Sequence, residues 1–215
     1  MKSSDGPANA STARILQVAT ALFAERGFHG VTTRQIASAA GLNIATVHHH
    51  VGTKRELYRK VYQAFAEEDE AFVHEIEGLF ARVDPGDGDA MRCLLEHVAD
   101  RVVTFAVERP VRARLMLRHW LTPDKDFVAF DADHSLKMFK RVRQLVASAR
   151  KKGTLQPRLD IGLLLRSLDW LVYGYVVSGA FDWKTWREDP ASAKHLRAFK
   201  GLVREYLVCM CGLDG

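Results

Sequence analysis

Residues 23–58 read FAERGFHGVTTRQIASAAGLNIATVHHHVGTKRELY, and this stretch decides the fold at the N-terminal end of the chain. Its apolar residues recur every three or four positions, and the runs are broken by short turns that each contain a glycine. The pattern predicts one helix at about 11–26, a second after Thr32 and a third that opens at Asn43. Three helices joined by tight turns within about 50 residues are the arrangement of a helix-turn-helix head.

Charge separates the same end from the rest of the chain. The 215 residues include 31 Lys and Arg against 26 Asp and Glu, a formal net charge of +5. The first 60 residues hold eight basic and three acidic side chains, so the remainder holds 23 of each sign. Because the whole excess lies on the first quarter of the chain, we expect that end to bind a polyanion.

The rest of the chain is predicted to be helical as well. Six prolines divide it into stretches that again have a period of three to four, and no alternating strand is followed by a hairpin turn. The fold class is therefore predicted to be all-α. Further helices are expected at 54–83, 89–108, 111–121, 124–151 and 161–181, with a last one that begins at the Asp189-Pro190 pair.

Composition excludes several classes of protein. With 47% hydrophobic residues, the chain buries a core and is not disordered as a whole. Its longest uncharged apolar run, Trp170 to Phe181, is shorter than the ~18 residues of a membrane span, so it is expected in the core. The N-terminus has no secretory signal, and three cysteines are too few for a disulfide framework. We therefore expect a cytoplasmic protein.

Catalytic and metal-binding motifs are absent from the sequence. It contains no phosphate-binding glycine loop, no Gly-x-Ser-x-Gly, no pairing of Cys with His, and no His-Glu-x-x-His. The run His48–His50 does not indicate a metal site, because consecutive residues of a helix project about 100° apart. We expect a protein that is not an enzyme and that has no cofactor.

The stretch 23–58 resembles the N-terminal signature of TetR-family transcriptional repressors. The shared features are a Gly-aromatic opening at Gly27 followed by paired threonines, an Ile-Ala-x-x-Ala-Gly turn from Ile36, a short recognition helix, and Lys-x-x-Leu from Lys54. The match runs without gaps over about 15–57. The resemblance implies a homodimer that binds double-stranded operator DNA and a small-molecule ligand.

Each matched position also has a physical reason to lie at DNA. Thr33, at the start of the second helix, is placed to bind a phosphate, and Arg34 reaches a guanine edge or a phosphate, the resemblance favouring the base. Ile44 and Ala45, at the exposed N-terminal end of the recognition helix, are placed against thymine methyl groups. Resemblance implies that Lys54 contacts a phosphate. The predicted DNA-binding residues are Thr33, Arg34, Asn43, Ile44, Ala45, Thr46, His48, His49, His50 and Lys54.

The histidines leave the base preference open. His48 stands where the family usually has a tyrosine that contacts DNA, and His50 matches a residue that bonds the DNA backbone or a phosphate. A histidine adds a charge that depends on pH. For His48 and His49 the alternative is a solvated polar face with no role at DNA.

By the same resemblance, the helices after the head form a regulatory and dimerisation domain that encloses a ligand pocket. We divide the chain into a flexible tail (1–12), a helix-turn-helix DNA-binding domain (13–58) and this regulatory domain (59–215). The candidate pocket residues are Phe65, His97, Phe105, Met116, His119, Trp120, Phe127, His134 and Met138. The alternative for each is ordinary core packing. Whether His97, His119, Asp133 and His134 form a polar or a metal site is left open.

The last two helices are expected to form the dimer interface. Both carry apolar residues at alternating spacings of three and four, and by resemblance they pair with their two-fold mates in a four-helix bundle. The predicted interface residues are Leu165, Leu168, Val172, Tyr175, Leu196, Phe199, Val203 and Tyr206. The alternative is that both stripes lie in the core of one subunit.

These features predict a sequence-specific DNA-binding transcriptional regulator. Its simplest form is a repressor that a small-molecule inducer releases from a pseudo-palindromic operator. The alternatives are a transcriptional activator and a less specific DNA-binding protein of the same fold. The helix at 54–83 runs from the head into the regulatory domain, so we expect it to act as the lever between them.

Overall fold

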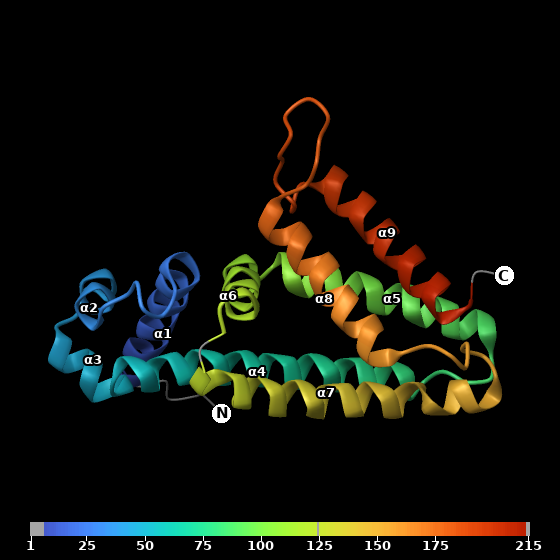
Figure 1. Ribbon diagram of the computed structural model, residues 1–215, viewed down its shortest axis with the longest axis horizontal. Coiled ribbons are helices and arrows are strands. Elements are labelled where there is room, and N and C mark those ends of the chain that lie inside the picture. The colour runs from blue at the N-terminus through green and yellow to red at the C-terminus, as the bar shows by residue number, and fades with distance from the viewer. Residues whose placement is uncertain (1–6, 124, 214–215) are drawn as a thin grey trace. The chain divides into compact units, whose positions relative to one another are not determined.

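The computed structural model of the chain describes residues 7–123 and 125–213, which are mostly helical (Figure 1). In chain order the helices are α1 (Pro7–Arg26), α2 (Thr33–Ala40), α3 (Ile44–Val51), α4 (Lys54–Phe80), α5 (Gly88–Val107), α6 (Pro110–Leu121), α7 (Lys125–Lys152), α8 (Ile161–Ser178) and α9 (Ala193–Cys211). Within these ranges the β structure is one isolated antiparallel bridge, between Ala180 and Glu188. The prediction of an all-α fold is confirmed.

Two of the expected helix starts were wrong. α1 begins at Pro7 rather than near residue 11, so residues 7–12, which we expected in the tail, are helical. α9 begins at Ala193, not at the Asp189-Pro190 pair. The carbonyl of Pro190 instead accepts a hydrogen bond from the Tyr175 hydroxyl at 2.9 Å, which holds this proline in the connection between α8 and α9.

The chain forms two compact units, which we describe separately. The first unit takes residues up to 69 together with 114–127, and the second takes 70–113 and 128 onward. Helices α4 and α6 therefore each contribute to both units. The first unit is larger than the expected domain of residues 13–58, because it also includes α4 as far as residue 69 and the C-terminal half of α6.

The first unit has a small core shared by its short helices. α1 packs against both α2 and α3, and α2 also packs against α3. The buried side chains include Ile15, Ala19, Phe23, Ile36, Ala40, Val47, Val51, Leu57 and Val61. Each fully buried aliphatic or aromatic side chain contributes about 1.5–3 kcal/mol. This core fixes α3 against α1 and so orients the exposed face of α3.

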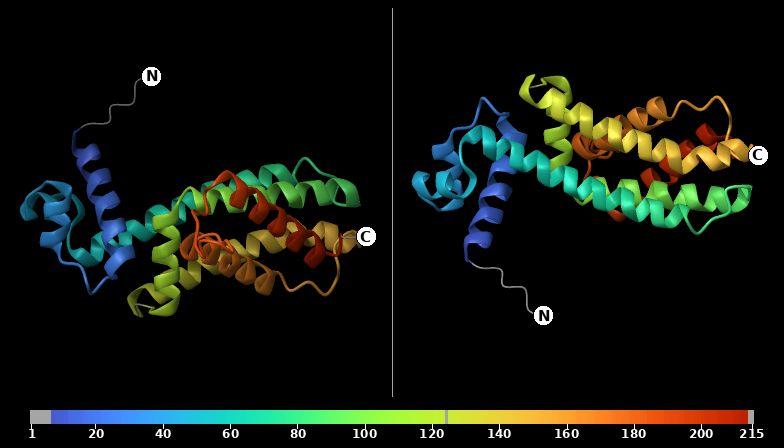
Figure 2. Two further views of the ribbon diagram at one scale, coloured as in Figure 1. Left: turned by 90° about the horizontal axis from the view of Figure 1, so that it is seen from above. Right: turned by 90° about the horizontal axis from the view of Figure 1, so that it is seen from below.

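The second unit is organised around α5, which packs along α9 and against α8 (Figure 2). Its core includes Val103, Leu155 and Val203, all fully buried. Ion pairs add to this packing at the surface. The Arg204 guanidinium donates to the Asp100 carboxylate, with the Nε to Oδ1 distance at 2.7 Å, and thereby joins α9 to α5. These contacts give the second unit a defined helix arrangement.

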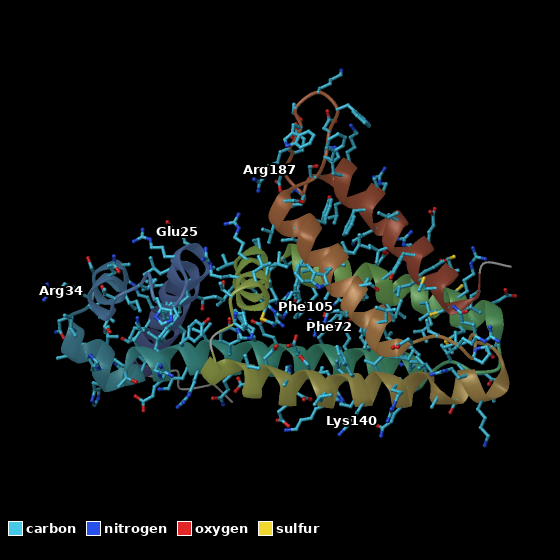
Figure 3. The ribbon with its side chains drawn as sticks, in the orientation of Figure 1. Glu25, Arg34, Phe72, Phe105, Lys140 and Arg187 are labelled. Atoms are coloured by element: carbon cyan, nitrogen blue, oxygen red, sulfur yellow. The ribbon has the colours of Figure 1, made fainter. Side chains whose placement is uncertain are left out.

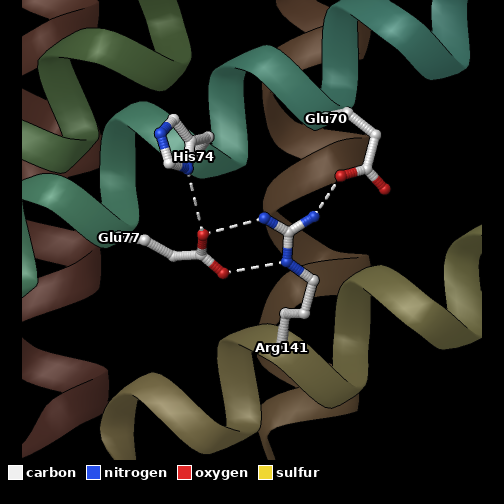
Figure 4. A network of polar contacts seen from close by, with 4 residues as sticks. All are labelled: Glu70, His74, Glu77 and Arg141. Carbon is white, nitrogen blue, oxygen red and sulfur yellow. Dashed lines mark hydrogen bonds and ion pairs between the residues drawn. The ribbon is translucent and has the colours of Figure 1, made fainter.

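Arg141 joins α7 to the second half of α4 (Figure 4). Its Nε and Nη2 each donate to the Glu77 carboxylate at 2.8 Å, and Nη1 donates to Glu70. The His74 ring lies 3.6 Å from the same Glu77 carboxylate. These hydrogen bonds lower the pKa of Glu77 and raise the pKa of Arg141. Residues 70–77 of α4 are thus held by one guanidinium.

Helix α8 is, among the described residues, the one helix with the length and composition to cross a membrane. A core helix passes the same test, and α8 buries Leu168 and Val172 in the second unit. The expected core placement of the run from Trp170 to Phe181 holds only in part, because both of its end residues are exposed.

Candidate nucleic-acid interface

The N-terminus of α2 has a fixed first turn. The Thr32 hydroxyl oxygen accepts a hydrogen bond from the Gln35 amide at 3.2 Å, and the Gln35 side-chain oxygen accepts one from the Thr32 amide at 2.8 Å. This capping box confirms Thr32 as the cap and leaves Arg34 exposed, pointing away from α2 (Figure 3). Thr33 is half-buried beside it. The positive end of the helix dipole lies here, where it favours a phosphate.

An open hollow of about 470 Å³ lies beside this turn. It is lined by Leu22, Arg26, Thr32, Arg34, Gln35, Ser38 and Ala39. Two guanidinium groups at its edge suit an anionic group such as a backbone phosphate of DNA. Arg26 was missed by the sequence analysis, because the last residue of α1 belongs to no DNA-contact motif and only its folded position brings it beside Arg34.

Helix α3 separates a buried side from an exposed one. Val47 and Val51 are fully buried. The Asn43 side chain accepts a hydrogen bond from the Thr46 amide at 2.7 Å, which confirms Asn43 as the cap. The side chains exposed on this helix and at its cap are those of Asn43, Ile44, Ala45, His48 and His49. The helix therefore presents a short mixed apolar and polar face, of the kind that reads base edges.

His50 differs from the two histidines before it. It is half-buried, and its Nδ1 lies 3.4 Å from the Thr12 hydroxyl of α1. Its main-chain oxygen accepts a hydrogen bond from the Lys60 ammonium at 3.2 Å. These contacts tie the end of α3 to α1 and α4, and the expected phosphate contact of His50 stays a prediction.

Lys54 is more engaged inside the protein than the sequence indicated. Its ammonium donates to the main-chain oxygens of Phe28 at 3.0 Å and Val31 at 2.9 Å, and it lies 4.2 Å from the centre of the Phe28 ring. Burial, with a smaller contribution from Arg55, lowers the pKa of Lys54. Two of its three N–H groups are used on the turn between α1 and α2, so at most one remains for the predicted phosphate contact.

The expected pocket residues are divided between the two units. In the first unit, Phe65 and His119 are buried and Met116 and Trp120 are half-buried, while the side chain of Phe127 lies outside those described. In the second unit, Phe105, His134 and Met138 are half-buried. His97 is exposed near the carboxylates of Glu75 and Asp100, and its place in a pocket wall stays a prediction.

The second unit also has a buried cation that the sequence analysis missed. Arg112 is buried, and its guanidinium lies 5.1 Å from the centre of the Phe105 ring. The Arg109 guanidinium lies 4.2 Å from the same ring, and Phe72 packs against it with ring centres 4.7 Å apart (Figure 3). In the sequence these arginines look like an ordinary charged helix face, so nothing marked them.

In the described part of the chain, no cluster of side chains is placed to bind a metal ion. No three His, Cys, Asp or Glu side chains are grouped there. Asp133 instead pairs with Lys137 at 2.6 Å, and the His119 ring lies 5.5 Å from that of Tyr62.

The predicted dimer residues are largely used inside the subunit. Leu168, Val172, Phe199 and Val203 are buried in the core of the second unit, as in the alternative of a core within one subunit. Their place in a dimer interface stays a prediction. The half-buried members also have partners within the chain, since Tyr175 stacks on Phe199 and the Tyr206 hydroxyl bonds to Ser167. Leu165 and Leu196 pack at the edge of the same core.

Comparison with known proteins identifies related sequences and folds. The family described as bacterial regulatory proteins, tetR family, matches residues 15–61, a range that contains every predicted DNA-binding residue. The chain is similar to the HTH-type transcriptional repressor AcnR of Corynebacterium efficiens, with 29% identity over 172 residues, which is 80% of this chain and 82% of AcnR.

Solved structures share the fold over nearly the whole chain. The fatty acid degradation regulator FadR from Bacillus halodurans aligns with a TM-score of 0.69 and 18% identity, covering 99% of this chain and 97% of FadR. The regulator FadR from Bacillus subtilis, solved in complex with stearoyl-CoA, aligns with a TM-score of 0.67 and 14% identity, covering 94% and 99%. At these identities the likeness is one of fold.

Proposed function

The chain belongs to the TetR family of bacterial transcriptional regulators, and from this premise we propose that it is a cytoplasmic, homodimeric repressor that a small molecule releases from its operator. It is a DNA-binding regulator, and its relatives are named regulators rather than enzymes. The repressor sense, the dimer and the response to a ligand are the parts proposed here.

The exposed face of α3 carries the proposal of sequence-specific binding. Ile44 has 37% of its surface exposed at the open end of the helix, although α3 has a buried side available for apolar residues. An exposed isoleucine next to Ala45 and His48 suits contact with thymine methyl groups and polar base edges. Thr33, Arg34 and Thr46 are then the proposed phosphate and base contacts around it. Lys54, whose ammonium holds the turn between α1 and α2, is proposed to contribute at most part of a phosphate contact.

The test is competition between specific and random DNA. A fluorescent fragment from upstream of the protein's own gene is titrated with the full-length chain at 150 mM salt. Binding that survives a thousandfold excess of random duplex supports an operator, since specific sites are typically bound at least ~10³-fold more tightly than random DNA. If random duplex competes as well as the same mass of the unlabelled fragment, sequence recognition is contradicted. That outcome supports the less specific alternative.

For the dimer, we propose the sides of α8 and α9 that the subunit leaves uncovered. Leu163 and Trp170 on α8 and Leu202 on α9 are 65%, 45% and 52% exposed. An added Cβ at Gly174 or Gly201, on the same two helices, would meet no atom within 4 Å. Glycine inside a helix costs about 0.5–1 kcal/mol relative to alanine, and close approach of another backbone is a reason to keep it.

The connection between α8 and α9 extends this uncovered surface. Phe181 packs edge-on against Trp183 and Trp186, with ring centres 4.8 Å and 5.3 Å apart, and Trp183 is 92% exposed. Paired hydrogen bonds between Ala180 and Glu188, at 3.0 and 2.8 Å, hold the segment in shape. Rigid exposed aromatics are typical anchors of protein interfaces. We propose that they contact the second copy, and light scattering that finds a monomer at micromolar concentration would contradict the dimer.

For the ligand, we propose an elongated apolar molecule with an anionic group. The support is the buried Arg112 beside the Phe105 and Phe72 rings in the second unit. Stearoyl-CoA, the ligand named for a structural relative, is the first probe, together with free stearate and coenzyme A. The expected result is that one of them raises the melting temperature and weakens operator binding. A ligand that binds without changing operator affinity would contradict the inducer role.

A further inference from the structure

The C-terminal end of α1, just before the turn to α2, is held by a residue of α6. The Arg118 guanidinium donates from Nε to the main-chain oxygen of Ala24 at 3.2 Å, and from Nη2 to that of Glu25 at 2.8 Å. Both oxygens lie in the last turn of α1, whose carbonyls have no partners within the helix. Arg118 thus caps the C-terminal end of α1 with a positive charge, where the helix dipole favours one.

Gly27 makes room for this cap. It follows α1 directly and has a φ of +73°, and a Cβ there would lie 3.4 Å from Arg118 Nη1 and 3.5 Å from Cδ. The guanidinium therefore rests directly on the main chain at the start of the turn. The turn leads within a few residues to the Thr32 cap, where α2 begins.

The same turn is held from α4 by Lys54. The Lys54 ammonium donates to the oxygens of Phe28 and Val31, which follow Gly27 in the chain, whereas those bound by Arg118 precede it. One cation from α4 and one from α6 therefore hold the main chain of residues 24–31. These are the two helices that also belong to the second unit.

The residue after Arg118 also fixes the end of α6. His119 is buried, and its ring lies 5.5 Å from that of Tyr62 on α4. The aromatic contacts continue from Tyr62 to Tyr58 at 5.0 Å and from Tyr58 to Phe23 of α1 at 4.9 Å. The C-terminal half of α6 is thus joined to α4 by packing and to α1 by hydrogen bonds.

We propose that Arg118 is a positioning residue that couples α6 to the DNA-reading surface, by holding the end of α1 and the turn that precedes α2. The inference rests on the proposed function, since it concerns how DNA affinity is set. Any change that moves α6 would move the cap on α1, and with it Arg26, Thr33 and Arg34. Coupling is reciprocal, so DNA bound at α2 and α3 must in turn stabilise α6.

That reciprocity allows a test with DNA alone. Hydrogen exchange of the full-length chain is measured with and without the operator fragment, for wild type, Arg118→Met, Arg118→Lys and Arg114→Met. Arg114 is an exposed arginine on the same helix and serves as the matched control. The methionine variant keeps the aliphatic part of the side chain and loses both hydrogen bonds. The lysine variant keeps the positive charge but lacks the planar guanidinium that donates two hydrogen bonds.

In free wild type and in Arg114→Met, amides of residues 27–32 should exchange equally slowly. In Arg118→Met they should exchange about twofold to fivefold faster, the range expected for losing an exposed cationic cap. Operator DNA should slow exchange in residues 114–121 of wild type and of Arg114→Met. Arg118→Met should lose most of that effect, and Arg118→Lys should keep part of it. If Arg118→Met merely unfolded part of the protein, it would also lose DNA binding. Loss of the DNA-induced slowing of exchange in α6, with DNA still bound, therefore indicates lost coupling.

Unchanged exchange at 27–32 in Arg118→Met would overturn the inference. The inference would also be overturned if operator DNA slowed hydrogen exchange in α6 as much in Arg118→Met as in wild type. The proposed function would stand in that case. If wild type binds no fragment in preference to random duplex, the proposed function fails and the coupling to DNA fails with it.

Discussion

The ammonium of Lys54 lies 2.9 Å from the main-chain oxygen of Val31, so the first residue of α4 is bonded to the residue just before the α2 cap. A second bond, to the oxygen of Phe28, completes its hold on the turn. Family resemblance gives Lys54 a phosphate contact, whereas the geometry gives it first a structural one. The two roles predict different results for the same substitution.

Lys54→Met is expected to lower the free energy of unfolding by about 1–2 kcal/mol, because it removes two hydrogen bonds from a half-buried cation. Operator and random DNA should lose affinity to the same extent. The slope of log Kd against log salt should change by less than about half a unit, since a full phosphate contact contributes ~0.9. Urea unfolding and anisotropy titrations measure both, with Arg55→Met as the exposed control. A full unit of slope with unchanged stability would restore the phosphate role.

Arg34→Ala and His49→Ala are expected to change which operator is preferred. Both side chains are exposed on the proposed reading surface, and a good base contact discriminates by about 1–3 kcal/mol. Arg26→Ala, at the edge of the hollow, should instead weaken binding to all sequences alike. Selection from a library of randomised operators measures the preference. Equal losses on every sequence for all three variants would refute the base-reading roles.

The first unit could be predicted well because its signals are local. The caps Thr32 and Asn43 bond to amides three residues away, and the buried Val47 and Val51 are four residues apart. Spacing along one helix determines such features. The DNA-contact candidates on α2 and α3 therefore lie at exposed or half-buried positions close together, although their contacts with DNA stay predictions.

The packing of the second unit could not be predicted to the same degree. The sequence shows that a helix has an apolar face, but it does not show which helix or which subunit covers that face. The stripes through Val172 on α8 and Val203 on α9 have the right spacing for packing, but spacing does not name the partner. In the structure both lie in the core around α5 of the same chain. Arg118 shows the same limit, since it bonds to Glu25, 93 residues earlier in the chain.

Gly174→Leu is expected to weaken the dimer by at least tenfold. A Cβ added at Gly174 meets no atom of its own chain within 4 Å, so we expect the larger side chain to obstruct a closely packed second copy. Gly78→Leu on α4 is the matched control, since a Cβ there also meets no atom within 4 Å. Sedimentation velocity at several concentrations gives the dissociation constant. Equal dimerisation of the two variants would place the interface elsewhere.

Arg141→Met is expected to destabilise the second unit by about 1 kcal/mol at pH 7, because the guanidinium bonds to Glu77 and Glu70 near the surface. Hydrogen bonds from Arg141 lower the pKa of Glu77 in the folded state. This contribution is therefore present above the carboxyl's unfolded pKa of about 4.3 and is lost as pH falls through the folded pKa. The difference in the free energy of unfolding between wild type and Arg141→Met should decrease steadily below about pH 4. Urea unfolding from pH 7 to pH 3 measures it, with the exposed Arg143→Met as control. A difference that stays constant over that range would show that Arg141 stabilises α7 by packing of its stem rather than through the carboxylates.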